Sequence, residues 1–303
     1  MAAPQSPIGS RRRLGAELRR LRLKVGLTLD DVAEMMTCST SKISRLETGK
    51  GVPKVPDVRE LMRIYGVTSE TESDMLLRLV KDGREHGWWE PLTDGVAPER
   101  FVLDQPGRYA ALENDATAVR SFDITVVHGL LQIPAYARAV LTATLPHHPP
   151  AEIDRLVELR SKRQEALRRA DPAPLELHAL LDEAVLRRPV GGREVMAAQL
   201  EHLAVAAESP NVTIQVLPFT AGILRAHAGH FVLVEIPHAL GSDVVYVEGH
   251  AGDSYLNGAS DVDLYKDVFA DASGHAQTAE VSAATIGRYH DEYAPPNPRT
   301  APR

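Results

Sequence analysis

The sequence predicts an N-terminal all-α domain of five short helices followed by an α+β domain with a small sheet. Two observations carry this prediction. In the N-terminal part, apolar side chains recur at helical spacing in five segments separated by Gly, Ser, Thr or Pro. In the C-terminal part, helical stretches alternate with four runs rich in β-branched residues and bounded by Pro or Gly: 175–181, 212–217, 231–236 and 244–247.

Spacing and capping residues place the five helices. The first is expected over about residues 11–25, where four apolar side chains share one face: Leu14, Leu18, Leu21 and Val25. Thr28 followed by Asp31 is a capping-box pattern that opens a second helix, and Ser39 caps a third. A fourth helix follows the Gly- and Pro-containing stop at 48–53, and a fifth is expected over about 69–81.

The same reading divides the whole chain. We expect a flexible arm over 1–10, the helical domain over 11–82, the α+β domain over 83–290 and a Pro-rich disordered tail over 291–303. Helices are expected in the second domain at 112–120, 134–144, 151–169, 193–207, 262–270 and 276–290. The order of its strands does not follow from the sequence.

Composition narrows the class of protein. Hydrophobic residues make up 44% of the 303 residues and charged residues 25%, as in globular proteins. No apolar run approaches the roughly 18 residues of a membrane span. The N-terminus has no apolar signal region, and the single cysteine, Cys38, excludes an internal disulfide framework. We therefore expect a cytoplasmic protein without a metal or cofactor.

The net charge of −7 is unevenly distributed. Residues 1–65 hold 13 Lys/Arg and 7 Asp/Glu, a balance of +6, and the remainder holds 21 basic and 34 acidic residues, a balance of −13. A basic module joined to an acidic body is typical of a protein that touches nucleic acid at one end. A solvated basic helix without a partner is the alternative that charge alone leaves open.

Residues 27–54 predict how such contact would be made. They form two short helices joined by a tight turn, and a helix entering the major groove of double-stranded DNA reads base edges with its N-terminal side chains. Hydroxyls and cations suited to that task lie on the second of these helices: Thr40, Ser41, Lys42, Ser44 and Arg45. Cations placed to contact phosphates lie in the loop that follows and near the chain start: Lys50, Lys54, Arg11, Arg12 and Arg13.

The segment GLTLDDVAEMMTCSTSKISRLETGKGVP resembles the lambda-repressor-like (XRE-type) helix-turn-helix, over about residues 11–66. The resemblance implies base reading by Thr40, Ser41, Lys42 and Ser44 with Arg45 adjacent. It implies packing roles for Ala33, Ile43 and Leu46, and a structural acceptor role for Glu47. Two positions depart from the family pattern: Leu29 replaces a phosphate-binding Gln, and Thr37 replaces a turn Gly, where a β-branched side chain resists a positive φ.

The second domain carries a resemblance of its own, over roughly residues 85–290. The segments LENDATAVRSFDITVVHGLLQIPAYARAVL, RSKRQEAL and LLDEAVLRRPVGGREVMAAQLEHL resemble the domain of unknown function in WhiJ-like developmental and antitoxin-like actinobacterial regulators. His128 departs from the Pro common there. The resemblance implies a transcription regulator associated with the nucleoid, a small BldB-like partner protein and a homodimer. A dimer would bind half-sites about 34 Å apart.

Other readings of the second domain remain open. A small-molecule sensor requires an apolar pocket with a few convergent polar groups, and a catalytic role would fall to His250 and Asp253. Two histidine pairs, His227–His230 and His147–His148, lack the spacing of a metal site. Trp88 and Trp89 could bind a partner or pack between domains. Ion pairs on a helix face are expected from Asp182, Glu183, Arg187 and Arg188.

Overall fold

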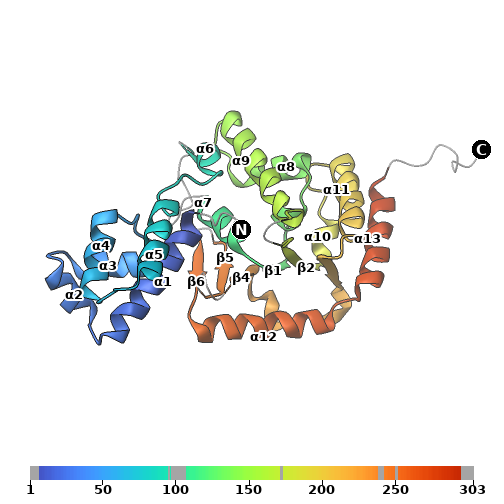
Figure 1. Cartoon of the computed structure of the whole chain (residues 1–303). Coiled ribbons are helices and arrows are strands. Elements are labelled where there is room, and N and C mark those ends of the chain that lie inside the picture. Colours follow the sequence, from blue (N-terminus) through green and yellow to red (C-terminus); the bar gives the residue numbers. More distant parts are fainter. Residues whose placement is uncertain are drawn as a thin grey trace, which may run out of the picture. The chain divides into compact units, whose positions relative to one another are not determined.

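The computed structural model describes residues 7–94, 96, 107–170, 173–237, 242–249 and 252–294 (Figure 1). The chain divides into two compact units. The first unit comprises Met1–Glu90, Gly107–Asp115 and Ile236–Ser242. The second unit comprises Pro91–Pro106, Ala116–Glu235 and Asp243–Arg303.

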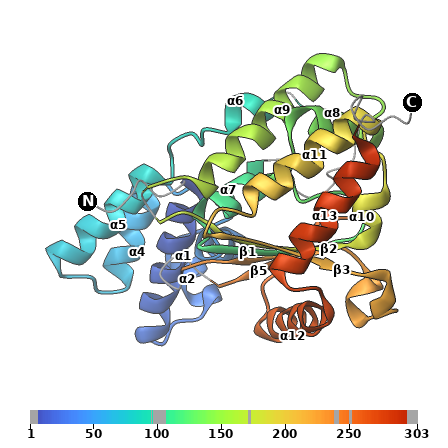
Figure 2. The same ribbon diagram turned by 90° about the vertical axis from the view of Figure 1, so that its right-hand side faces the viewer.

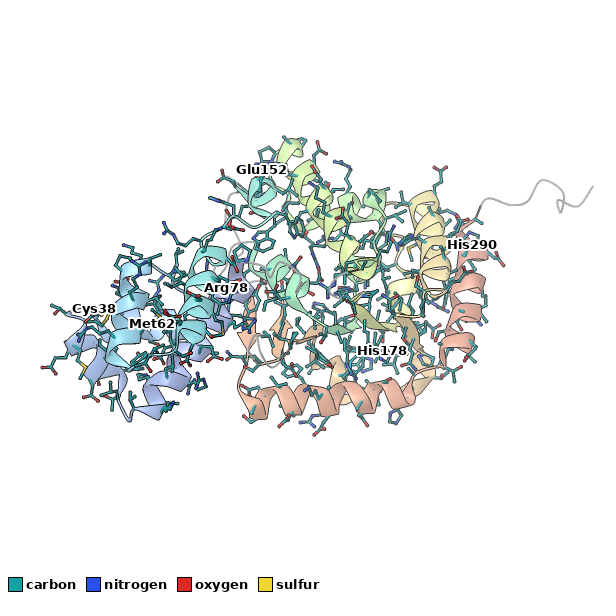
Figure 3. All side chains as sticks on the ribbon, viewed as in Figure 1. Cys38, Met62, Arg78, Glu152, His178 and His290 are labelled. Atoms are coloured by element: carbon teal, nitrogen blue, oxygen red, sulfur yellow. The ribbon has the colours of Figure 1, made fainter. Side chains whose placement is uncertain are left out.

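The first unit contains the five predicted helices: α1 (Pro7–Lys24), α2 (Leu29–Met35), α3 (Thr40–Glu47), α4 (Val55–Ile64) and α5 (Glu70–Asp82). Their apolar faces meet in one core. Its buried members are Leu14, Leu18, Leu21, Val32, Ala33, Ile43, Leu46, Val58, Leu61, Met62, Tyr65, Leu76, Leu79 and Val80. Figure 3 shows Met62 among these helices and Cys38 at the turn between α2 and α3, where Cys38 packs partly buried against the core.

The helix α1 begins earlier than the sequence predicts. It starts at Pro7 rather than near residue 11, so the last four residues of the expected arm are helical. Proline suits the first turn of a helix, because an N–H at that position would have no partner within the helix and proline lacks one. Gly9 and Ser10 are buried, and a Cβ on Gly9 would lie 2.4 Å from Oδ2 of Asp115 in α7 (Gly107–Asp115). The small residues that suggest an arm therefore permit close packing; residues 1–6 lie outside the described residues.

Both tryptophans belong to the first unit. Trp89 is 3% exposed, and a Cβ on Gly87 or Gly107 would lie 2.3 or 2.5 Å from its indole atoms. Trp88 is 38% exposed and meets the Trp89 ring edge-on, with 5.7 Å between centroids. Trp89 is therefore a packing residue of this unit. Because the chain has two tryptophans, their emission reports on the first unit alone.

The second unit is built on a six-stranded mixed sheet of order β3-β2-β1-β4-β5-β6. Its strands are β1 (Ala118–Asp123), β2 (Glu176–Asp182), β3 (Val212–Leu217), β4 (Phe231–Glu235), β5 (Val244–Val247) and β6 (Ser254–Leu256). The first three run parallel, and β4, β5 and β6 each pair antiparallel with the preceding strand in the sheet. Four of these strands fulfil the sequence prediction, with β3 and β5 matching to the residue.

The sequence does not predict two of the strands, β1 and β6. The expected helix over 112–120 is wrong in its second half, where the chain turns into β1 after α7 ends at Asp115. The apolar spacing of 110–119 continues across this boundary, so periodicity alone does not reveal it. Burial decides the outcome, because β1 lies between β2 and β4 and five of its six residues are buried. The short β6 completes the antiparallel edge.

Helices cover both faces of the sheet, as Figure 2 shows. One face is covered by α8 (Pro134–Thr144), α9 (Pro150–Arg163) and α11 (Arg193–Ala206), and the opposite face by α12 (Ala259–His275). The helix α13 (Ala279–Tyr293) packs on α11 and β3. Short helical segments complete the chain: α6 (Glu90–Thr93), η1 (Gly129–Leu131), η2 (Gln164–Leu167), α10 (Glu183–Arg187), η3 (Phe219–Ala221) and η4 (Arg225–Ala228). No helix of the described residues has the length and apolar character needed to cross a membrane.

His128, which stands where the resembling domain commonly has Pro, keeps a backbone conformation like that of proline. His128 has φ −53° and ψ 142°, values that proline itself adopts. The imidazole Nδ1 accepts a hydrogen bond from the Leu130 N–H at 3.3 Å and so caps η1. Leu130 and Leu131 then enter the core. The histidine thus supplies a cap that proline could not.

The acidic and basic residues around α10 form a semi-buried network rather than simple helix-face pairs. The Asp182 carboxylate caps α10 by accepting from the Ala184 N–H at 2.8 Å. The Tyr289 hydroxyl donates to Glu183 and accepts from Arg187 Nε, the latter at 2.8 Å. The direct Arg187–Glu183 distance is 3.9 Å. A tyrosine from α13 therefore bridges the two charges and ties α13 to α10.

Candidate nucleic-acid interface

The start of α2 is fixed by the capping box that the sequence predicts. Thr28 Oγ1 accepts from the Asp31 N–H at 3.2 Å, and the Asp31 carboxylate accepts from the Thr28 N–H at 2.8 Å. The Thr28 hydroxyl also donates to the Asp31 carboxylate, at 2.7 Å, and this bond together with the bond from the Thr28 N–H lowers the pKa of Asp31 because both favour the charged carboxylate. Ser39 caps α3 in the same way by accepting from the Lys42 N–H at 3.2 Å. Local sequence thus sets both ends of the turn.

The turn between α2 and α3 carries backbone strain at Thr37. Its φ is +50°, and it is the one residue other than glycine with a positive φ among those described. The β-branched side chain disfavours this left-handed conformation by about 1–2 kcal/mol. The substitution of Thr for the usual Gly therefore leaves the turn geometry in place and adds strain to it.

Thr37→Gly is expected to stabilise the first unit by about 0.5–1 kcal/mol, because strain relief exceeds the entropy that glycine loses on folding. Urea unfolding followed by tryptophan emission measures the change. Thr68→Gly is the matched control, since Thr68 does not have a positive φ and so gains no relief. A Thr37→Gly protein no more stable than wild type would show that the turn is not strained.

The helix α3 presents a polar face to solvent. Ile43 and Leu46 are 0% and 6% exposed and anchor the opposite face in the core. Ser41 and Arg45 are exposed and Ser44 is half-buried. With the exposed Thr48 they follow helical spacing and so share one face: Ser41, Ser44, Arg45 and Thr48. We call these four residues the α3 face.

Two of the predicted base-reading side chains are held by carboxylates. Thr40 Oγ1 donates to Asp30 Oδ1 of α2 at 2.7 Å. Lys42 Nζ lies 2.9 Å from Asp57 Oδ1 of α4. Both side chains are therefore directed toward neighbouring helices. Asp30 and Asp57 have no sequence signal, because their pairing depends on how α2 and α4 pack beside α3.

A buried ion pair fixes α3 against α1. Arg22 Nε and Nη2 donate to the two carboxylate oxygens of Glu47 at 2.6 and 2.9 Å, and Arg22 Nη1 donates to the Leu27 carbonyl at 2.8 Å. The two side chains are 8% and 6% exposed. Glu47 is thus the structural acceptor that the sequence resemblance implies, and Arg22 is its partner. This two-pronged pair orients the end of α3 relative to the core.

The predicted phosphate contacts differ in accessibility. Lys50 and Lys54 are exposed in the loop after α3. Arg12 is half-buried beside Gly49, whose φ is +69° and where a Cβ would lie 2.9 Å from Arg12 Cα. Arg11 Nε donates to the Gly83 carbonyl at 2.5 Å and ties α1 to the end of α5. Burial lowers the pKa of Arg11.

The two histidines of the His227–His230 pair contact different carboxylates. His227 Nε2 pairs with Asp182 Oδ2 at 3.2 Å, whereas His230 Nδ1 lies 3.5 Å from Asp123 Oδ1. Among the described residues, no group of three or more His, Cys, Asp or Glu side chains could hold a metal ion. His250 lies outside the described residues, and its suggested partner Asp253 is buried.

Comparison with known families agrees with this geometry. Residues 13–76, which include α2, the strained turn and α3, match a helix-turn-helix domain model. Residues 106–288, more than half of the chain, match the model of a domain of unknown function, DUF5753. The chain belongs to the DUF5753 family. It is a DUF5753 protein with an N-terminal helix-turn-helix, which makes it a DNA-binding transcription regulator. Searches among curated proteins and among solved structures gave no match.

His230 gives the DUF5753 region a pH-dependent contribution to stability. Burial lowers its pKa, but the hydrogen bond and charge of Asp123 outweigh burial and raise the pKa overall. The stabilisation is therefore complete below the unfolded-state pKa near 6.5 and is lost as pH rises through the higher folded-state value.

His230→Gln is expected to destabilise the second unit below pH 6 and to converge with wild type at alkaline pH. Differential scanning calorimetry across pH 5–9, with His275→Gln as an exposed-histidine control, measures the difference. A wild-type to His230→Gln gap that does not change with pH would contradict the charged Asp123–His230 pair.

Proposed function

We propose that this protein is a sequence-specific transcription regulator that reads its operator with α3. Ser41, Ser44 and Arg45 approach base edges in the major groove, with Arg45 suited to guanine O6 and N7. The observation that carries the proposal is the α3 face, because its polar side chains are exposed while Ile43 and Leu46 hold the same helix in the core. A buried recognition helix could not serve this purpose.

The remaining predicted contacts take supporting roles. Thr40 and Lys42 reach DNA only by sharing or leaving Asp30 and Asp57, so their contribution is smaller than that of Arg45. Phosphate binding falls chiefly to the exposed cations Lys50 and Lys54. Arg11 and Arg12 lie half-buried on α1 and take a smaller part in binding the DNA phosphates. Such contacts position the protein without reading sequence.

Binding to DNA selected from a random pool tests this function. The full-length protein is expected to enrich one sequence, with an affinity that falls steeply as salt rises because phosphate-bound counterions are released. Palindromic half-sites about 34 Å apart would establish the homodimer. A pool without enrichment, or an affinity that does not respond to salt, would contradict the proposal. Association with the bacterial nucleoid in the cytoplasm follows from such binding.

The second unit is proposed to receive a regulatory input. Its resemblance to the domain of WhiJ-like, antitoxin-like regulators favours a small BldB-like partner protein. Co-purification of the full chain with the product of a neighbouring small gene tests this input. Binding of the two purified proteins that alters operator affinity would support it, and two proteins that do not associate would contradict it.

A small-molecule input is the second candidate, and polar side chains gathered at one edge of the sheet favour it.

A catalytic role is not proposed for this edge. The Ser121 hydroxyl donates to Asp123 Oδ2 at 2.6 Å and not to His230. Acyl transfer requires a hydrogen bond between nucleophile and base, and Ser121 does not make that bond to His230.

A further inference from the structure

Sheet topology brings distant segments together at one edge of the second unit. Asp123 is the last residue of β1. Because β4 runs antiparallel to β1 and Phe231 pairs with Phe122, His230 lies at the same edge. Val247 of β5 pairs with Ser254 of β6, so Glu248 and Asp253 also lie there.

This edge is where an α/β sheet binds ligands. The connection after β1 leads through η1, α8 and α9 to β2 on one side, whereas β4 lies on the other side of β1 (Figure 1). Ligands of open α/β sheets bind outside the carboxyl ends of the parallel strands. The carboxyl ends of the parallel strands β1, β2 and β3 lie at this edge, beside the amino end of the antiparallel β4.

His230 contributes a cation when protonated, and its Nε2–H is available to a ligand. Its Nδ1 donates to the Phe122 carbonyl at 3.2 Å and lies 3.5 Å from Asp123 Oδ1. Asp123 is 3% exposed and also accepts from Ser121. Among the described residues, His230 Nε2 has no hydrogen-bond partner, and its side chain is 24% exposed. When the ring is protonated, the Nε2–H can therefore donate a hydrogen bond to a ligand.

Arg160 contributes a cation held by a neutral group. Its Nη1 donates to Gln132 Oε1 at 2.6 Å, and Gln132 Nε2 in turn donates to the Val127 carbonyl at 2.6 Å. No carboxylate of the described residues lies within ion-pair distance of Arg160. Burial, followed by the charge of Arg163, lowers the pKa of Arg160 to about 10. The guanidinium remains charged at neutral pH, and its charge is fixed in place by an amide.

Carboxylates form the other half of the cluster. Asp253 is 7% exposed and accepts a hydrogen bond from the Tyr246 side chain. Burial raises the pKa of Asp253, and the nearby charge of Glu248 adds to this effect. Glu248 itself is exposed, and its charge raises the pKa of Arg160, of His230 and of Asp253. Glu248 is thus the carboxylate common to the whole cluster.

We propose that Arg160, His230, Glu248 and Asp253 bind a small zwitterion of the α-amino-acid class, which serves as the input to the proposed regulator. The ligand carboxylate binds Arg160 and the His230 Nε2–H, and the ligand ammonium binds Glu248 and Asp253. No direct ion pair joins Arg160 or His230 to Glu248 or Asp253 among the described residues, although the charge of Glu248 acts on both cations. A ligand with a single charge sign would satisfy one half of the cluster and be repelled by the other.

Isothermal titration calorimetry on the full-length protein tests the site. The probes are the proteinogenic L-α-amino acids taken one at a time, with acetate and methylammonium as ligands that carry one charge each. We expect saturable binding of at least one amino acid and none of acetate or methylammonium at the same concentration. No heat with any amino acid, or equal binding of acetate, would overturn the proposal.

Matched variants locate the binding. Arg160→Gln and Glu248→Gln should each weaken it at least tenfold, and Arg160→Lys should retain part of it because the charge remains but the two-pronged donor is lost. Arg155→Gln and Glu158→Gln, on the same helix α9, are the controls. Wild-type affinity in Arg160→Gln would overturn the site. If Arg160→Gln fails to fold, the affinity of Arg160→Lys tests the site instead, and wild-type affinity in that variant would overturn it.

Operator binding by the same preparations separates this inference from the proposed function. The ligand inference rests on the regulatory role of the second unit, but the calorimetric measurement contains no DNA. Amino-acid binding without operator binding would contradict the transcriptional role alone. Operator binding without amino-acid binding would contradict the ligand site alone.

Discussion

Glu47→Ala is expected to lower the free energy of unfolding of the first unit by about 3–5 kcal/mol, because it leaves the guanidinium of Arg22 buried without its counter-charge. Arg22 keeps its bond to the Leu27 carbonyl, which compensates only one of its donors. The emission of Trp88 and Trp89 follows this unit through urea unfolding without interference from the second unit.

The double substitution Arg22→Met with Glu47→Leu separates a lost charge partner from lost packing. Because both charges are removed together, the double variant should recover most of the stability lost in Glu47→Ala. Glu60→Ala breaks an exposed ion pair with Arg63 and should leave the unfolding midpoint unchanged. A Glu47→Ala midpoint equal to that of Glu60→Ala would contradict the role of the buried pair.

Arg45→Ala is expected to weaken operator binding by about 5- to 150-fold, the equivalent of 1–3 kcal/mol for a guanine contact in the major groove. Arg45 is the one exposed cation of the α3 face. Its loss should reduce discrimination at one base-pair position while leaving non-specific binding nearly unchanged. Fluorescence anisotropy with the selected operator and with substituted operators measures both quantities.

Two further variants separate base reading from phosphate binding. Lys50→Ala should weaken binding to all sequences alike and reduce the slope of log affinity against log salt by about 1. Arg78→Ala, on α5 and away from the α3 face, should retain wild-type affinity. Equal losses on specific and non-specific DNA in Arg45→Ala would show that Arg45 binds phosphate instead of a base.

The helical unit could be predicted closely because its signals are local. Thr28, Asp31 and Ser39 cap helices through bonds between residues three positions apart, and the spacing of the leucines defines α1. The strained turn could also be predicted, since a β-branched residue at Thr37 conflicts with a positive φ. What failed here was the start of α1, which depends on packing against the distant α7.

The second unit was predictable only where a strand carries its own pattern. The strands β3 and β5 are rich in β-branched residues, whereas β1 reads AVRSFD and lacks that composition. Its position between β2 and β4 is decided by partners far along the chain. The pairing of Asp123 with His230 has the same origin, because residues more than a hundred positions apart meet only in the folded sheet.

The interface was located by motif, but its internal contacts were not. The hydroxyls and cations of residues 40–45 lie where the sequence places them on α3. The carboxylates of Asp30 and Asp57, which hold Thr40 and Lys42, depend on the angles at which α2 and α4 meet α3. A sequence motif contains no information on those angles, so it cannot rank the base-reading residues.

Guanine N7 methylation interference on the selected operator tests the central claim most directly. Methyl groups at N7 lie in the major groove, so they should block wild-type binding at one or more guanines in each half-site. The Arg45→Ala protein should lose interference at one of these guanines and keep it at the others. Binding that is indifferent to N7 methylation, or an unchanged pattern with Arg45→Ala, would contradict base reading by the α3 face.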